Sequence, residues 1–261
     1  MTEQAAEITW TQHDLDCAQA VITLSSPESD NLPTLTDEEI VALDGLEREQ
    51  FVELPWLAEH QDQKELVCNV ALRTLLTKGF AFPLVSEGET LPSALGATDN
   101  IVGVMTLRRT GERIISAELT KSDDKAWLYG YLHQDQVLEE LVDSAGTHTF
   151  TVVPAAEFGD HLLQLADAAD LESEDGEPQT YSEAEFEAAA PTVLADARGV
   201  TVIAGISAAE DSFRHYTIYT TSTELFGLTS AEKDGAAELS LAKVSRSTAV
   251  EAANRVIFPT S

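Results

Sequence analysis

The chain has 261 residues, of which 43% are hydrophobic and 23% charged, a composition typical of globular rather than disordered proteins. It carries 46 acidic against 15 basic residues, a formal net charge of −31 at pH 7. Such a charge repels nucleic-acid phosphates and anionic lipid head groups, so we expect neither nucleic acid nor a membrane as partner. The acidity either favours a basic partner or reflects a general adaptation of the cell's proteins, such as salt tolerance.

Targeting signals and cysteine motifs are both lacking in the sequence. The first residues, MTEQAAEITWTQHD, have no basic or apolar segment of the kind found in signal peptides. No run of 18 apolar residues is present, and we expect a cytoplasmic protein. Cys17 and Cys68 lie too far apart for a zinc knuckle or a redox CxxC pair, and Cys68 is expected as a small buried hydrophobe.

The N-terminal third contains two predicted helices. The segment 18–26 is compatible with a short strand. Thr36, with Glu39 three residues later, has the spacing of a capping box and predicts a helix start. The stretch 51–60 is either a strand cut short by proline or a break before the next helix.

The clearest helix covers residues 62–80. Gly79 after Lys78 is typical of a helix end in the left-handed conformation. Its apolar stripe at helical spacing consists of Leu66, Val67, Val70, Ala71, Leu75 and Leu76.

The stretch 101–120 is locally basic in an otherwise acidic chain. Residues 100–109 are rich in Val and Ile and predict a strand, TGER predicts a turn, and 114–123 predicts a second strand. Arg108, Arg109 and Arg113 would then surround the tip of a hairpin. The tip is either a binding surface or an ordinary turn with arginines facing water.

A mixed pattern follows this stretch. Residues 125–135 predict a strand, 136–146 a short helix, 147–154 a further strand and 155–171 a helix.

Residues 167–187 hold nine acids and no base, which predicts a solvated linker. A helix is predicted from Tyr181 or Ser182 to about 197, turning at Pro191.

The pattern of strands ending in a helix then returns. Its predicted strands and C-terminal helix are 199–208, 213–222, 224–232, 239–245 and 246–258. Residues 101–145 and 199–258 therefore share an element order, although their side chains differ.

We predict an α+β fold of two similar halves with pseudo-twofold symmetry, each a mostly antiparallel β-meander with packed helices. The predicted division is an N-terminal half at 1–170, an acidic linker and helix at 171–198, and a C-terminal half at 199–261. The three parts could also form one compact domain.

No catalytic, cofactor or metal motif withstands inspection. SDDK at 122–125 has the SxxK spacing of some acylating enzymes but lies between predicted strands, and GISAA at 205–209 lacks the second glycine of a nucleophile elbow. The six histidines form neither HxH nor HExxH, and His13 lies beside two acids that face different ways on a regular element. We expect no enzyme activity, cofactor or metal.

The element order is similar to that of the EspG-type chaperones of type VII (ESX) secretion. The likeness rests on LTDEEIVAL, ELVCNVALRTLLTKGF, IVGVMTLRR, IISAEL and THTFTVVPAAEF. It implies a cytosolic, non-enzymatic chaperone that binds the apolar tip of a helical secretion substrate. Arg108, Arg109 and Arg113 become candidate partner contacts, and reversing their charges should abolish capture without changing the melting curve.

Two other classes of function stay open. An acidic inhibitor or immunity protein would cover a basic toxin or nuclease, and electrostatic steering would give it fast association. An enzyme with scattered site residues would require a deep pocket holding groups with perturbed pKa values.

Overall fold

The computed structural model describes residues 9–24, 26–85, 94–122, 124–167, 169–207, 214–233 and 236–258. Residues 1–8 and 208–213, which include the start of the chain and the end of the GISAA stretch, lie outside the described residues.

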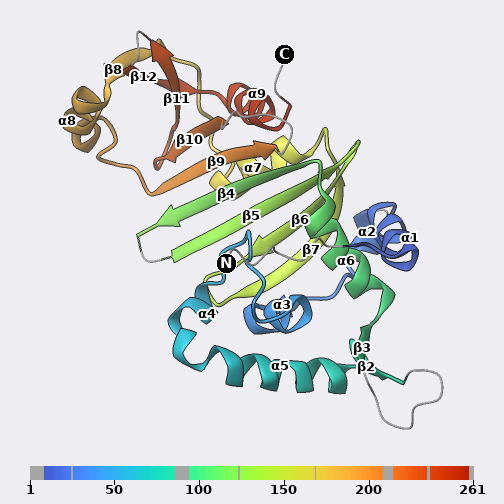
Figure 1. Cartoon of the computed structure of the whole chain (residues 1–261). Coiled ribbons are helices and arrows are strands. Elements are labelled where there is room, and N and C mark those ends of the chain that lie inside the picture. The colour runs from blue at the N-terminus through green and yellow to red at the C-terminus, as the bar shows by residue number, and fades with distance from the viewer. Residues whose placement is uncertain are drawn as a thin grey trace.

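Two β-meanders, each followed by a helix, form the centre of the molecule (Figure 1). The first consists of β4 (Arg113–Lys121), β5 (Asp124–His133), β6 (Gln136–Val142), β7 (Thr147–Pro154) and α7 (Phe158–Ala166). The second consists of β9 (Gly199–Ser207), β10 (Arg214–Thr220), β11 (Leu225–Lys233), β12 (Ala236–Val244) and α9 (Arg246–Ile257). The predicted α+β fold with two similar halves is confirmed, but the first meander and its helix cover 113–166 rather than the predicted 101–145.

All ten strands of the main sheet are paired antiparallel. Two short strands, β1 (Leu35–Thr36) and β8 (Gln179–Ser182), close its edges in the order β1-β7-β6-β5-β4-β9-β10-β11-β12-β8. At the centre, Arg113 lies opposite Ser207 and Lys121 opposite Gly199, so the first strand of one meander runs against the first strand of the other. This pairing gives the sheet its pseudo-twofold arrangement. The sheet crosses the predicted domain boundaries at 170 and 198, and the division itself stays a prediction.

One face of the sheet is covered by α7 and α9, which also contact each other. The apolar cluster under them draws on both meanders. Its members include Ile115, Ala117, Phe158, Leu162, Ile203, Ile218, Ala253 and Ile257. Because the strands alternate, the intervening side chains point to the opposite face.

The opposite face of the first meander is covered by the N-terminal helices. These are α1 (Gln12–Ile22), α3 (Asp37–Asp44) and α6 (Asp99–Thr110), with short α2 (Ser26–Ser29) beside β7. Trp127, Tyr129 and Tyr131 of β5 are buried beneath them.

An outer layer lies over α3 (Figure 1). It consists of α4 (Pro55–Glu59), the turn η1 (Gln61–Gln63), α5 (Lys64–Lys78) and the separate hairpin of β2 (Ala81–Leu84) and β3 (Ala94–Ala97). The predicted helix at 62–80 is α5, and Gly79 follows it with φ +74°, as expected. At the other end of the sheet, α8 (Glu183–Val193) follows β8 and has Ser182 as its N-cap.

Four local predictions are corrected or decided by the structure. Residues 100–109 are not a strand, because all of them lie in α6, whose buried Ile101, Val104 and Leu107 recur at helical spacing. The segment 18–26 is no strand, since α1 runs through Ile22. The stretch 51–60 proves to be a break followed by α4.

The predicted helix at 136–146 is strand β6. Val137 and Leu138 are both fully buried although they point to opposite faces, because helices cover the sheet on both sides here. A strand buried on two faces has a continuous apolar run that short-range periodicity does not distinguish from a helix.

Among the described residues, no helix is both long enough and apolar enough to cross a bilayer.

Candidate functional site

The predicted arginine hairpin at 108–113 does not exist, because Arg108 and Arg109 lie in the last turn of α6 and Arg113 begins β4. Arg108 is only 4% exposed, and its Nε donates to Glu140 Oε2 at 2.8 Å. Arg109 donates from Nη2 to Asp44 Oδ2 at 2.6 Å. Arg113 is half-buried. The role of the three arginines as partner contacts stays a prediction, but the side chain of Arg108 is buried and not available to contact a partner in this conformation.

Arg108 belongs to a buried ionic cluster formed with Glu140, Tyr131, His148 and Asp37. Tyr131 donates its hydroxyl to Glu140 Oε2 at 2.6 Å. The ring of His148 lies between two carboxylates, with Nδ1 2.7 Å from Glu140 Oε1 and Nε2 2.8 Å from Asp37 Oδ1. The cluster therefore joins α6 and α3 to strands β5, β6 and β7.

The pKa values within the buried ionic cluster follow from this geometry. Burial alone would raise the pKa of Glu140, but Arg108 and His148 outweigh it and lower that pKa to about 2. Burial opposes the charged form of His148, yet the hydrogen bonds with Asp37 and Glu140 raise its pKa. Burial and the neighbouring Glu140 raise the pKa of Tyr131. Glu140 is thus an anion and His148 is biased toward a cation inside the protein.

The buried ionic cluster is structural in character. His148, Asp37 and Glu140 have no exposed surface, so a substrate has no route to them in this conformation. Charges buried in this way need partners on every side, because an unpaired ion in the interior is costly. No sequence motif pointed to the cluster, since its members lie on five elements.

One surface depression is an apolar groove between α1, α6 and the β2–β3 hairpin. Its volume is about 620 Å³. Its apolar wall includes Leu43, Leu72, Phe82, Leu84, Leu95, Ile101 and Met105. Phe82, Leu84 and Leu95 are 42%, 43% and 50% exposed, which leaves one side of the groove apolar and open. We name this depression the hairpin groove.

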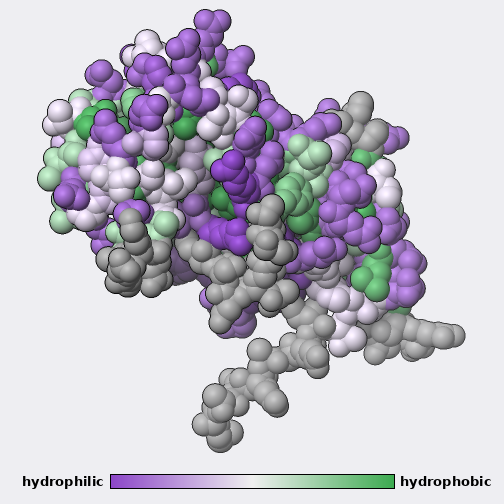
Figure 2. All heavy atoms as spheres, turned by 90° about the horizontal axis from the view of Figure 1, so that it is seen from above, coloured by the Kyte–Doolittle hydropathy of each residue, from purple (hydrophilic) through white to green (hydrophobic). Residues whose placement is uncertain are grey.

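A second, smaller depression lies on the sheet where β4, β5 and β9 meet, with a volume of about 380 Å³. Val202 and Ile206 of β9 line it and are 42% and 59% exposed. Seen from above, the rest of the molecule is mostly hydrophilic, with scattered hydrophobic patches (Figure 2).

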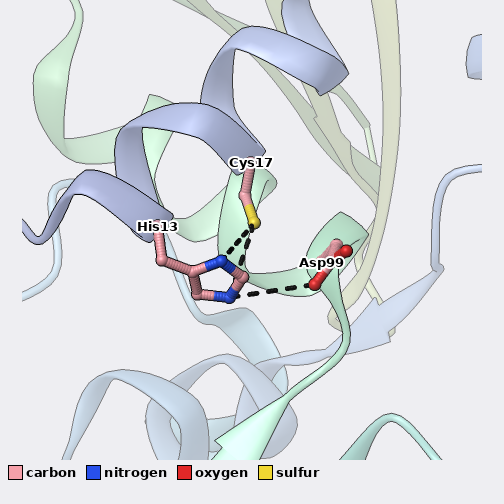
Figure 3. Close-up of side chains that lie close together, drawn as sticks. All are labelled: His13, Cys17 and Asp99. Atoms are coloured by element: carbon pink, nitrogen blue, oxygen red, sulfur yellow. Dashed lines mark hydrogen bonds and ion pairs between the residues drawn. The ribbon is translucent and has the colours of Figure 1, made fainter.

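Three side chains with metal-ligating atoms lie close together (Figure 3), and His13 among them also lines the hairpin groove. His13 and Cys17 come from α1, and Asp99 begins α6. His13 Nε2 lies 3.7 Å from Cys17 Sγ and 3.8 Å from Asp99 Oδ1. Burial and then Asp99 raise the pKa of the Cys17 thiol. The sequence pointed to His13 but not to the two residues that join it here.

Both rejected enzyme motifs stay without support in the geometry. SDDK lies at the turn from β4 to β5, and its Lys125 is bound to Glu118. Of GISAA, residues 205–207 belong to β9, where Gly205 packs against Val256, and residues 208 and 209 lie outside the described residues.

Comparison with known proteins gives a likeness of fold. No protein-family model and no curated protein sequence matches the chain. The structure of the Mycobacterium tuberculosis type VII secretion system chaperone EspG5, in complex with a PE25–PPE41 dimer, is similar with a TM-score of 0.58. The match covers 86% of this chain and 95% of the other at 9% sequence identity. The chain has an EspG-like fold. The resemblance inferred from element order is thus confirmed at the level of fold.

Proposed function

We propose that this protein is a non-enzymatic, cytoplasmic chaperone that holds the apolar tip of a helical type VII secretion substrate. The observation that carries the proposal is the hairpin groove, with its open apolar wall on β2 and β3. The EspG-like fold supports it, because the similar structure is of a secretion chaperone bound to a protein dimer.

Exposed apolar side chains are concentrated in and beside α5 and the β2–β3 hairpin, and Phe82, Leu84 and Leu95 among them line the groove. Of the large hydrophobic side chains exposed in the described residues, half lie between residues 64 and 97. They are Leu66, Val70, Leu76, Phe82, Leu84, Val85 and Leu95. Leu66 and Val70 belong to the apolar stripe predicted for α5. They lie on the part of this stripe that faces away from the core. Apolar side chains gathered on one outer segment favour a protein partner.

The size of the hairpin groove suits one end of a helix. A depression of about 620 Å³ falls within the range of pockets that take several apolar groups. An amphipathic helix places such groups three and four residues apart on one face and can insert them together. Burying them removes apolar area from water at roughly 25 cal/mol per Å².

The test places charges in the groove wall. We expect the double variant Leu84→Asp, Leu95→Asp to fold, because both side chains are half exposed. Its affinity for the partner should fall at least tenfold, since each aspartate would be desolvated in the complex. The partner is first identified by affinity purification from the native cell with mass spectrometry, and binding is then measured calorimetrically with the purified protein.

The matched control is the double variant Val202→Asp, Ile206→Asp, which puts two charges on an exposed apolar surface away from the hairpin groove. It should bind like the wild type. Equal binding by all three proteins, or recovery of a partner without an apolar helix tip, would contradict the proposal.

A second candidate function is favoured by the net charge of −31. An acidic inhibitor or immunity protein would bind a basic toxin or nuclease through long-range attraction, and its association rate would fall steeply with salt. Binding in an apolar groove changes little with salt. Measuring the association rate between about 50 and 500 mM NaCl separates the two functions, because screening increases strongly over that range.

A further inference from the structure

The ends of two helices bring three different ligating atoms together beside the hairpin groove (Figure 3). His13 and Cys17 are four residues apart on α1 and therefore share one face of that helix. Asp99 lies in the first turn of α6. The two helices approach closely at Gly103, where a Cβ atom would stand 2.6 Å from the carbonyl oxygen of Cys17.

The distances among these atoms suit a tetrahedral ion. All three ligating atoms lie within 4.8 Å of one another. Ordinary Zn–S, Zn–N and Zn–O bonds place ligand atoms roughly 3.3 to 3.6 Å apart around a tetrahedron. The separations of 3.7 Å and 3.8 Å from His13 Nε2 are close to those values.

The site combines one anchored ligand with two adjustable ones. Cys17 is 5% exposed and is held in the packed face of α1. The side chains of His13 and Asp99 are 64% and 81% exposed, so they can turn toward an ion without disturbing the core. As an ion pair between exposed groups, His13 and Asp99 would contribute little stability.

We propose that His13, Cys17 and Asp99 form a binding site for a divalent transition-metal ion of the zinc class. Sulfur and imidazole ligands favour Zn²⁺, whereas Mg²⁺ and Ca²⁺ require mainly oxygen ligands. On binding, the Cys17 thiol loses its proton to solvent and the sulfur bonds the ion as thiolate. Water completes the coordination, on the side where His13 and Asp14 line the hairpin groove.

A bound ion would join α1 to α6, the two helices that pack together over the first meander. Because the ion binds only the folded arrangement, it stabilises the protein by mass action. This property does not depend on the proposed partner, so the two proposals can fail separately.

The test measures metal binding by the full chain, freed of metal with a chelator and dialysed. Calorimetry should give one Zn²⁺ per chain, and Co²⁺ should give a thiolate charge-transfer band and the visible bands of tetrahedral cobalt. At a concentration about 100 times Kd, Zn²⁺ should raise Tm by on the order of 5 °C. Mg²⁺ at the same concentration is the control for simple screening of the acidic surface.

The variants Cys17→Ala, His13→Gln and Asp99→Asn should each weaken Zn²⁺ binding at least tenfold. Cys68→Ala, which removes the other buried thiol, should bind like the wild type. Should Cys17→Ala fail to fold, the two variants of exposed ligands decide the question. Unchanged Zn²⁺ binding in those variants, a Co²⁺ spectrum without the thiolate band, or an equal effect of Mg²⁺ would overturn the proposal.

Discussion

The two meanders are covered by helices in the same way on one face of the sheet and differently on the other. On the shared face, α7 and α9 pack against each other and close an apolar cluster to which both meanders contribute. On the other face, α1, α3 and α6 bury the aromatic side chains of β5 in the first meander. The corresponding face of the second meander leaves Val202 and Ile206 exposed.

This difference shows where the protein can bury charge. The buried ionic cluster of Arg108, Glu140 and His148 lies where helices meet strands over the first meander. In the described part of the second meander, the buried polar side chains are the threonines Thr201, Thr217 and Thr221. In the first meander, both buried glutamates of β6 have a basic partner from a covering helix: Arg108 of α6 pairs with Glu140, and His161 of α7 pairs with Glu139.

We expect the largest loss of stability from removing Arg108, the cation of the buried ionic cluster. We expect Arg108→Met to lower the free energy of unfolding by about 3–5 kcal/mol, because it removes the buried cation that pairs with both Glu140 and Asp44. Urea denaturation measures the loss. It follows that reversing the charges of all three arginines would lower the melting temperature, contrary to the expectation from the sequence.

The control is Arg255→Met on α9 of the second unit, whose side chain is 72% exposed and 3.7 Å from Glu251. Such a surface pair contributes at most about 1 kcal/mol. Equal effects of the two substitutions would mean that the buried ionic cluster has no special role.

Stability should depend on pH through the same cluster. The pKa of Glu140 is lowered to about 2, so its contribution, on the order of 3 kcal/mol, is complete above its unfolded value near 4.5 and is lost as pH falls toward 2. The pKa of His148 is raised, so its contribution is complete below about 6.5 and is lost as pH rises through the higher folded value.

Melting temperatures of the wild type and His148→Gln between pH 5 and pH 9 test the second half of this statement. The difference between the two proteins should shrink as pH rises. His60→Gln, which removes an imidazole stacked on Trp56 outside the cluster, should run parallel to the wild type. A constant difference for His148→Gln would contradict the prediction.

One substitution made in both meanders compares their outer faces directly. Val152→Thr in β7 places a hydroxyl in the covered face, where the side chain is 1% exposed, and should cost about 1–3 kcal/mol. Val202→Thr in β9 should change stability by at most about 0.5 kcal/mol, since that side chain is 42% exposed. Thermal or urea unfolding measures both. A similar loss at the two positions would show that the second face is covered in solution.

The smallest effect concerns the helical layer itself. Gly103→Ala puts a methyl group against the backbone of Cys17, which no rotamer change relieves. Overpacking costs about 1–3 kcal/mol and the gain in helix propensity returns about 1, so we expect a net loss of about 1 kcal/mol. Gly199→Ala is the control, because its Cβ would lie at an ordinary 3.4 Å from Leu119. A stabilised Gly103→Ala protein would mean that α1 and α6 separate easily.

The elements that were predicted correctly are those whose sequence signals, such as capping residues, lie within one or two helical turns. At the start of α3, the Glu39 carboxylate accepts from the Thr36 N–H at 3.3 Å, as the capping spacing implied. Gly79 ends α5 with a positive φ, and Ser182 caps α8, although that helix ends at Val193 rather than near 197. The prediction that Cys68 is buried is confirmed, since it is 2% exposed.

The errors fall on apolar runs of intermediate length. Residues 100–109 were predicted as a strand because Val and Ile are common in strands, yet they pack as a helix on the sheet. Residues 136–146 were predicted as a short helix ending at Gly146, yet 136–142 form β6. In the structure Glu139 and Glu140 are both buried.

The amino-acid sequence by itself determined the α+β class, the second meander with its C-terminal helix, and several helix ends, whereas the first meander and its helix lie at 113–166 rather than at the predicted 101–145. Those features depend on backbone preferences and hydrogen bonds within a few residues. Only the tertiary structure decided which face of each meander is covered, where Arg108 lies and which residues meet His13. Glu140 lies 32 positions from Arg108, and Asp37 lies 111 positions from His148. Only the folded sheet and its helices bring these groups together.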